Sequence, residues 1–403
     1  EDSTGLKLPL YQSKLVTDGV PDKSRVISKT DLLESQNLNP PYGGFANQDF
    51  EVAQIYRTSG TTGSPLLLSF TKYDVDLITE IGAECFEYSG MGGVGNEEVV
   101  INCLNLSMWA GGFFDAQSMM KTGVQVINFG TGNTKELIKL ILTVSKEFKV
   151  SIHCTPSYLP IIQNRLDNDF GMKPGSLNIW KFYLGAEGGL QNNQFRKTLI
   201  STWGCEVLNA NYGMSEVCSI MASANAENLL RFSPKFLKNY YCELLVNGDI
   251  LPLKDCQSSD IGELIVTSLR KQSQPVLRYN SKERIRIINI VGDSIYFEVV
   301  GRSDDMLVIK GINFFPEQLR GILLGIEGLT GAYKVEATKK NNIIDRLNLI
   351  CEIKSTTSSS NLELKNLIEK SIRDDLTISC DVNFVYEIPL RGNKSRLLEI
   401  FEE

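Results

Sequence analysis

Short strand-like segments alternate with longer helical segments through the middle of the chain, and this alternation constrains the fold more than any other feature. Apolar runs of four or five residues are typical of buried strands, and the segments between them have helical patterns. Strands and helices that alternate in this way form mainly parallel sheets covered by helices. We therefore predict an α/β fold. The expected strands are 124–127, 150–154, 181–184 and 206–208, and the expected helices are 134–148 and 194–203.

Two further regions complete the expected organisation. Residues 243–266 are richer in strand-like segments with turn residues between them, which predicts a small β subdomain. After residues 301–304 the pattern restarts on a smaller scale, with a strand at 306–309 and a helix at about 316–324. About 100 residues suffice for a small α+β domain. We therefore expect one domain over residues 1–303 and a second over residues 304–403.

Charge and cysteine content exclude several classes of protein. A formal net charge of −7 over 403 residues offers no basic surface for nucleic acid or for an anionic membrane. The nine cysteines include no C-x-x-C pair, so they predict free thiols in a reducing compartment. No apolar run reaches 18 residues, and the first residues do not resemble a signal peptide. We expect a cytoplasmic protein with neither nucleic acid nor membrane as a partner.

The chain contains a single histidine, His153. One histidine excludes metal sites built from several histidines, and His153 alone could serve Ser-His-Asp catalysis. Its neighbours Ile152 and Cys154 are apolar, so we expect His153 to be structural rather than catalytic.

A loop rich in glycine and hydroxyl groups is the first candidate site. Residues 55–65 read Ile-Tyr-Arg-Thr-Ser-Gly-Thr-Thr-Gly-Ser-Pro. Glycines let the backbone approach a ligand closely, and backbone N–H groups and hydroxyls can bind a polyphosphate. The alternative is an ordinary surface turn. This is not a Walker loop, because no lysine follows the second glycine. The candidate phosphate-binding residues are Ser59, Gly60, Thr61, Thr62 and Gly63.

A second candidate site follows two of the expected strands. Residues 211–216 read Asn-Tyr-Gly-Met-Ser-Glu and come after the strand 206–208, while Gly185-Ala186-Glu187 follows the strand 181–184. Ligands bind to open α/β sheets in crevices at the carboxyl ends of strands. A carboxylate such as Glu216 suits Mg²⁺ that is shared with phosphates. The alternative at Glu216 is a turn with a solvated glutamate.

These motifs, followed by Gly301-Arg302-Ser303-Asp304-Asp305 and by Lys394, occur in the order seen in adenylate-forming enzymes. The chain resembles that superfamily over nearly its whole length, and in particular its phenylacetate–CoA ligase branch. The resemblance implies MgATP as cosubstrate, Glu216 as the Mg²⁺ ligand, Lys394 as the catalytic lysine and Asp304 as the hinge of a mobile C-terminal domain. It assigns to the nucleotide site the loop 59–63 and Ala186, Glu187, Asn211, Tyr212, Gly213, Met214, Ser215, Glu283 and Arg302.

The resemblance also points to an acyl pocket and reveals departures from the family pattern. Aromatic and small residues can shape a slot for a flat acid, although they can equally be ordinary packing. Glu283 aligns with an aspartate that holds both ribose hydroxyls in the family, and Gly188 replaces a family proline. Asn393 precedes Lys394 where the family has glycine. The candidate pocket residues are Trp109, Ala110, Gly111, Tyr158 and Gly185.

The expected function is therefore activation of a carboxylic acid, aromatic by the resemblance, to acyl-AMP, followed by transfer to a thiol. The thiol is CoA or the phosphopantetheine arm of an acyl carrier protein, and assembly into a homodimer is left open. Two alternatives remain at this point. One is adenylation of a phenolic hydroxyl, as in the related coenzyme F390 synthetases, and the other is a degenerate adenylate-binding module without enzymatic activity, suggested by Glu283 and Gly188.

Overall fold

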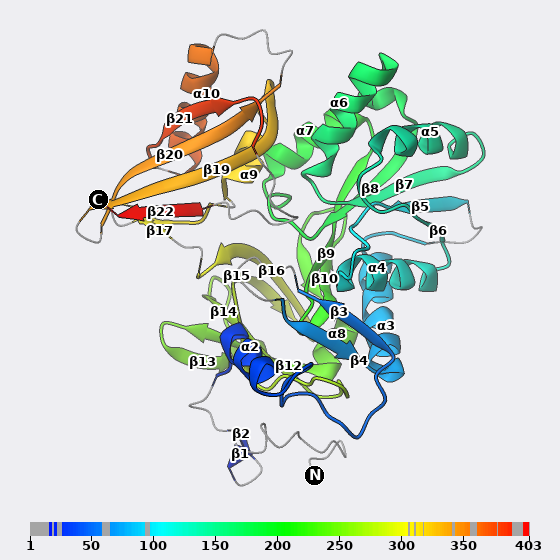
Figure 1. Ribbon diagram of the computed structural model, residues 1–403, viewed down its shortest axis with the longest axis vertical. Coiled ribbons are helices and arrows are strands. Elements are labelled where there is room, and N and C mark those ends of the chain that lie inside the picture. Colours follow the sequence, from blue (N-terminus) through cyan, green and yellow to red (C-terminus); the bar gives the residue numbers. More distant parts are fainter. Residues whose placement is uncertain are drawn as a thin grey trace.

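A single twelve-stranded sheet forms the centre of the larger, N-terminal part of the protein (Figure 1). The computed structural model describes residues 16–17, 20–21, 26–58, 65–92, 97–304, 307–309, 312–316, 318–340, 343–354, 361–376, 378–388 and 398–402.

One half of the sheet is parallel, as the alternating pattern predicts. Its strand order is β9-β8-β7-β5-β6, and each neighbouring pair runs parallel. Residues on β5 and β7 are buried along almost their whole length, which is expected where helices cover both faces. The strands are β5 (Glu98–Asn102), β6 (Gln125–Asn128), β7 (Lys149–Cys154), β8 (Ile179–Gly185) and β9 (Glu206–Met214).

The other half of the sheet is antiparallel and contains the strand-rich region expected as a β subdomain. It continues from β9 in the order β10-β11-β16-β15-β14-β12-β13, so this region extends the main sheet. The strands are β10 (Cys218–Ala224), β11 (Leu230–Phe232), β12 (Tyr240–Val246), β13 (Asp249–Pro252), β14 (Ile261–Ser268), β15 (Tyr279–Val291) and β16 (Ser294–Arg302). A separate hairpin, β3 (Gln54–Arg57) with β4 (Leu67–Phe70), and the short pair β1 (Val16–Thr17) and β2 (Val20–Pro21) lie outside it.

Helices cover the two faces of the parallel half. One core cluster packs Leu137, Ile162 and Phe195 of α5–α7 against the sheet, and another packs Phe86 and Met119 of α3 and α4 against its other side. Several helix ends have standard caps, such as the capping box of Thr71 and Asp74 at α3. The helices are α2 (Lys29–Leu38), α3 (Lys72–Tyr88), α4 (Ala110–Lys121), α5 (Thr134–Val144), α6 (Tyr158–Phe170), α7 (Asn193–Trp203) and α8 (Pro234–Asn239).

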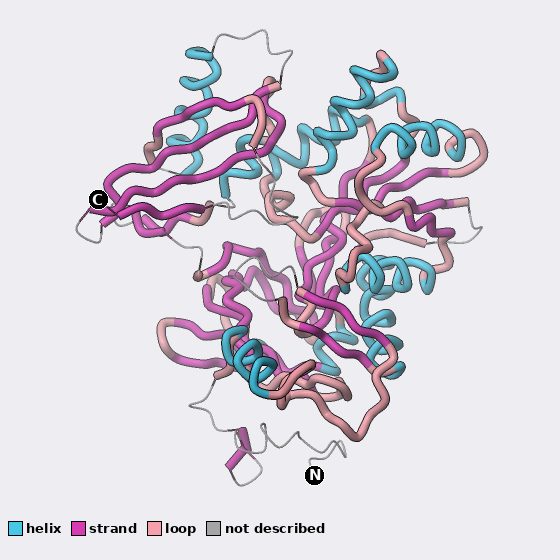
Figure 2. The backbone as a smooth tube through the Cα atoms, viewed as in Figure 1, coloured by secondary structure: helices cyan, strands magenta, loops and turns pink. Residues whose placement is uncertain are grey.

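The C-terminal part has its own sheet, as Figure 2 shows, and its own hydrophobic core. The sheet order is β21-β20-β19-β22, and Leu349, Ile368 and Ile372 are among the residues buried beneath it. This confirms the expected smaller α+β unit beside the larger α/β part. Its elements are β17 (Leu307–Ile309), β18 (Ile312–Phe314), α9 (Gln318–Leu323), β19 (Leu329–Lys340), β20 (Ile343–Ile353), α10 (Asn361–Leu376), β21 (Asp381–Val385) and β22 (Leu398–Glu402).

All nine cysteines are free thiols, and eight of them are buried. Within the described residues, no helix is both long enough and apolar enough to cross a membrane.

Candidate active site

Strand β9 extends into the predicted nucleotide motif. It continues to Met214, so Tyr212 and Gly213 lie on the strand rather than in a turn after a shorter strand. The neighbouring strand β10 explains the extension, because Tyr212 pairs with Ala222 across the ladder. A Cβ atom on Gly213 would lie 2.0 Å from the backbone oxygen of Ser219, so only glycine fits between the two strands.

Tyr212 combines a packed ring with a buried hydroxyl. The ring lies edge-on to Phe297, with 5.2 Å between the ring centroids. Its hydroxyl oxygen is buried and has no hydrogen-bond partner in the part of the chain that the structure describes. Burial raises the pKa of Tyr212 well above its usual value, and the negative charge of Glu283 adds to this increase. A buried, unpaired hydroxyl beside charged groups indicates a functional site.

Tyr279, the first residue of β15, brings the predicted charged residues together. It is buried, and burial is the main reason that its pKa lies well above the usual value. Four charged side chains also act on its phenol: Glu216, Arg302, Glu283 and Asp304. The sequence pattern alone does not distinguish Tyr279 from an ordinary packing residue, because tyrosine is common in strands.

Glu216 lies in the turn after β9 and is already paired with a cation. Its Oε1 atom is 2.9 Å from Nζ of Lys29 on α2, and the carboxylate is largely buried. The buried ammonium of Lys271 donates to the Glu216 backbone oxygen at 3.2 Å. Burial lowers the pKa of Lys271, while nearby carboxylates including Glu216 oppose that shift. Met214 and Ser215 precede Glu216 and are partly buried.

The residues around Glu216 are compatible with Mg²⁺ that is shared with a bound nucleotide. No group of three or more His, Cys, Asp or Glu side chains within the described residues could hold a metal by itself. Mg²⁺ in nucleotide sites usually takes one or two carboxylates and completes its ligands with phosphates and water. A single buried carboxylate at Glu216 fits that donor set.

Glu283, Arg302 and Asp304 form one connected group. Glu283 and Arg302 are opposite each other on β15 and β16, and Arg302 Nη1 donates to Glu283 Oε1 at 3.0 Å. Arg302 also donates to both carboxylate oxygens of Asp304, at 2.9 and 2.7 Å. Burial lowers the pKa of Arg302, but these two carboxylates outweigh burial and raise it. Arg302 therefore links the predicted ribose-binding residue to the predicted hinge residue.

The loop after β8 has the close approach that its glycine predicts. A Cβ atom on Gly185 would lie 2.5 Å from the Cβ atom of Asn211, so the two predicted nucleotide segments touch. Ala186 has a positive φ of 61°. The Glu187 carboxylate accepts hydrogen bonds from the backbone N–H and the hydroxyl of Ser157, at 3.1 and 2.8 Å. The Glu187 carboxylate thus binds the segment just before α6.

The candidate acyl-pocket residues lie in two different places. Trp109, Ala110 and Gly111 form the start of α4, where Trp109 pairs with Arg57 of β3 through an isolated bridge. Tyr158 instead starts α6 and packs in the core beneath α5–α7. Its hydroxyl is 3.0 Å from that of Thr134, and burial raises the pKa of Tyr158 to about 12. The first group and Tyr158 therefore belong to different packing environments.

His153 is structural, as expected, but it belongs to a network that the sequence did not reveal. The imidazole is fully buried, and its Nε2 atom is 2.8 Å from Asp115 Oδ2. The Nδ1 atom is 2.7 Å from the backbone oxygen of Tyr183, which requires a proton on Nδ1. Asn211 donates to the same Asp115 oxygen at 2.6 Å. The network joins α4, β7 and β9 directly beneath the nucleotide motif.

Two predicted groups lie outside the described residues. They are the phosphate-binding loop, Ser59–Gly63, and the catalytic lysine, Lys394.

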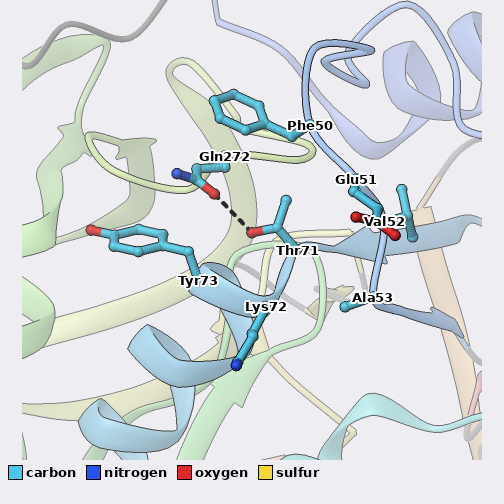
Figure 3. A pocket seen from close by; sticks show the side chains of 8 residues that line it. All are labelled: Phe50, Glu51, Val52, Ala53, Thr71, Lys72, Tyr73 and Gln272. Atoms are coloured by element: carbon cyan, nitrogen blue, oxygen red, sulfur yellow. Dashed lines mark hydrogen bonds between the residues drawn. The ribbon is translucent and has the colours of Figure 1, made fainter.

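A shallow depression of about 380 Å³ lies at the start of α3 (Figure 3). Thr71 and Gln272 are hydrogen-bonded at its wall, at 3.0 Å. None of the predicted site residues lines it, so we assign the candidate site from the arrangement of charged side chains instead. The lining residues are Phe50, Glu51, Val52, Ala53, Thr71, Lys72, Tyr73 and Gln272.

Comparison with known proteins identifies relatives along nearly the whole chain. Residues 311–400 match the family model described as AMP-binding enzyme C-terminal domain. Phenylacetate-coenzyme A ligase of Escherichia coli (strain K12) is 27% identical over 407 residues, which cover 98% of this chain and 90% of that protein. The ligase of the same name from Thermus thermophilus is 26% identical over 352 residues, covering 83% and 73% of the two chains.

Solved structures share the fold. The crystal structure of 2-hydroxyisobutyryl-CoA ligase in the postadenylation state, in complex with its acyl-AMP, has a TM-score of 0.78 at 19% identity, covering 93% of this chain and 79% of that one. The same ligase in its thioesterification state, with CoA, has a TM-score of 0.60 at 20% identity, covering 94% and 80%. The resemblance predicted from the motifs is confirmed: over nearly its whole length the chain is similar to phenylacetate–CoA ligases, and it shares the fold of solved CoA ligases.

Proposed function

We propose that this protein is an AMP-forming acid–thiol ligase, which activates a carboxylic acid with MgATP and transfers the acyl group to CoA. The observation that carries this proposal is the connected group of Glu283, Arg302 and Asp304, whose charges act together with that of Glu216 on the buried Tyr279. Full-length similarity to phenylacetate–CoA ligases supports it.

The proposed chemistry does not require a general base. A carboxylic acid is already ionised at neutral pH, so the enzyme has only to position it and neutralise charge. When bound, MgATP supplies the adenylyl group and part of that neutralisation. In this proposal Tyr212 stacks on adenine, Glu283 binds the ribose hydroxyls and Glu216 holds the metal. Lys29 brings a further positive charge to the same place, since its ammonium lies against Glu216.

The remaining assignments extend the proposal to the rest of the chain. Residues 304–403 act as a mobile domain that turns about Asp304, and Lys394 contacts the reacting phosphate. The loop 59–63 holds the polyphosphate. Trp109, Ala110 and Gly111 shape the acid pocket, which suits a flat aromatic acid because the helix start presents an indole next to two small residues.

Several finer points are also proposals. The acceptor is CoA, with the phosphopantetheine of a carrier protein as the alternative thiol. The nine free thiols support a reducing compartment, which favours the cytoplasm.

The test is acid-dependent exchange of labelled pyrophosphate into ATP, with a panel of aromatic and aliphatic acids and a phenol. Exchange with an acid, followed by thioester formation with CoA, supports the proposal. Exchange only with the phenol would favour adenylation of a phenolic hydroxyl. ATP binding without exchange for any compound would favour a binding module, and thioester formation only on a carrier protein would change the acceptor.

A further inference from the structure

Helix α9 of the C-terminal unit packs tightly against the loop that follows β8. A Cβ atom on Gly321 of α9 would lie 2.9 Å from the Cβ atom of Asn192, which caps α7. On the loop, Gly189 has a positive φ of 107°, and a Cβ atom there would lie 3.5 Å from the Arg320 side chain. Both sides thus have glycine where the two backbones approach each other. The contact joins the C-terminal unit to the larger part of the protein.

An ion pair crosses this contact. Arg320 Nη1 lies 3.1 Å from Glu187 Oε2, and the two side chains are only 11% and 19% exposed. Because water is largely excluded, this pair is stronger than a typical surface salt bridge.

Each partner of this ion pair is held by its own side of the contact. Glu187 is fixed by two hydrogen bonds from Ser157. The Arg320 guanidinium lies 5.8 Å from the ring centre of Tyr333 on β19, and the Tyr333 hydroxyl donates to the Pro316 backbone oxygen at 3.0 Å. The two charges are therefore preorganised, which lowers the entropy lost when they meet.

The same loop contacts the predicted adenylate site. Glu187 is two residues from Gly185, which lies against Asn211 of the nucleotide motif. A ligand that moves this loop must also move the Glu187 carboxylate, and so changes its fit to Arg320. The chain superposes better on the solved ligase in its postadenylation state than in its thioesterification state, so the ion pair is formed in an arrangement of the first kind.

We propose that Glu187 and Arg320 are positioning residues that latch the C-terminal unit to the adenylate-site loop, so that nucleotide occupancy and the orientation of this unit are coupled. The role of this latch in catalysis rests on the proposed function, whereas the contact between Glu187 and Arg320 does not depend on that function. By linkage, a nucleotide that tightens the latch is itself bound more tightly when the latch is closed. Opening the latch then frees the unit for thiol transfer.

The latch can be measured by disulfide trapping in the full chain. Asn192→Cys with Gly321→Cys places two thiols at the contact, where a shift of about 1 Å suffices for disulfide geometry. We compare trapping rates in this parent and after adding Arg320→Gln, Arg320→Lys, Glu187→Gln or the double change. The matched control is Arg165→Gln, which removes an exposed arginine paired with Asp169 on α6.

Loss of either charge should slow trapping about tenfold, as expected for one lost charge-assisted hydrogen bond. The double change should slow it no further than the single changes do, and Arg320→Lys should restore most of the rate. The control should trap like the parent, and thermal unfolding verifies that every variant is folded. Trapping within twofold of the parent in Arg320→Gln would overturn the latch. An additive loss in the double change would also overturn it.

Ligand coupling and catalysis are measured separately. MgATP together with phenylacetate as probe should change the trapping rate of the parent at least threefold, and an unchanged rate would overturn the coupling. In the chain with native Asn192 and Gly321, Arg320→Gln should lower the kcat of pyrophosphate exchange about tenfold and raise the KM for ATP about threefold, the factor that linkage with the trapping rate requires. Thioester formation from supplied phenylacetyl-AMP should stay within twofold, and an equal loss in both half-reactions would overturn the positioning role. If exchange is absent for every acid, the proposed function fails. The trapping rates still show whether Glu187 and Arg320 hold the C-terminal unit against the loop.

Discussion

Shortening Glu283 to aspartate is the most informative single change, because it tests the proposed ribose contact at a position where the chain departs from its family. Glu283 Oε1 accepts from Arg302 Nη1 at 3.0 Å, and the side chains are 22% and 38% exposed. Removing one methylene withdraws the carboxylate by about 1.5 Å, which places it beyond hydrogen-bond reach of Arg302. Arg302 keeps its two bonds to Asp304, so the hinge contact should survive.

The structure separates the expected effect on stability from the effect on ligand binding. The ion pair between Glu283 and Arg302 is partly exposed, so its loss should lower the free energy of unfolding by at most about 1 kcal/mol. Misplaced hydrogen bonds from a carboxylate to the two ribose hydroxyls should cost about 1.5–3 kcal/mol of binding free energy. This corresponds to an ATP dissociation constant raised about 10- to 150-fold. Nucleotide affinity should therefore fall much more than stability.

The assay is calorimetric titration with MgATP, together with chemical denaturation of each variant. The control is Glu298→Asp, which shortens a glutamate that pairs with Arg286 across the same two strands. We expect similar small losses of stability in both variants, with weaker ATP binding only in Glu283→Asp. Equal ATP affinity in the two variants would refute the ribose assignment. Tighter binding in Glu283→Asp would favour the degenerate binding module.

Three further changes test other parts of the proposal. Lys394→Ala should abolish most pyrophosphate exchange but leave thioester formation from supplied acyl-AMP much less affected, because a lysine of the first half-reaction is remote in the second; equal losses would contradict its assignment. Asp304→Pro should leave most pyrophosphate exchange intact but impair thioester formation, because proline fixes φ and prevents rotation at the hinge. A native overall rate would exclude this hinge. Burial raises the pKa of Glu263, but hydrogen bonds from Asn280 and other neighbours outweigh burial and lower the pKa below its usual value. The stability that the ionised Glu263 contributes is thus present above the usual pKa of a glutamate and is lost as pH falls through the lowered pKa. Glu263→Gln should therefore cost more unfolding free energy at pH 6 than at pH 3, measured by chemical denaturation. Equal costs at the two pH values would refute this reasoning.

The order of strands and helices could be predicted because burial on both faces leaves a direct trace in the sequence. The apolar run at 150–154 is an example, since β7 is covered on both sides by helices. The attachment of β15 and β16 to the rest of the sheet could not be predicted. It depends on pairings such as Leu230 with Phe297, which are distant in the chain. For the same reason β9 is longer than its apolar segment, because β10 supplies the ladder that holds Tyr212 in a strand.

Individual site residues could be identified from motifs, but their partners could not. Glu216 follows from the motif, whereas Lys29 lies on a helix near the other end of the N-terminal part, and only tertiary packing brings the two together. Asp115 is a lone acid in an apolar helix, and its role becomes visible only when His153 and Asn211 converge on one of its oxygens. Motifs specify residue type and order, while the electrostatic environment depends on the whole fold.

The two arginine contacts at the C-terminal unit determine how firmly it is held. The bidentate pair of Arg302 and Asp304 is partly exposed and contributes about 0.5–1 kcal/mol. The more buried pair of Arg320 and Glu187 contributes about 1.5–3 kcal/mol. If both contacts break when the unit turns, their sum of about 2–4 kcal/mol favours the observed arrangement roughly 30- to 700-fold. A ligand that prefers the other arrangement by a similar free energy can reverse that ratio, so these contacts are strong enough to position the unit and weak enough to release it.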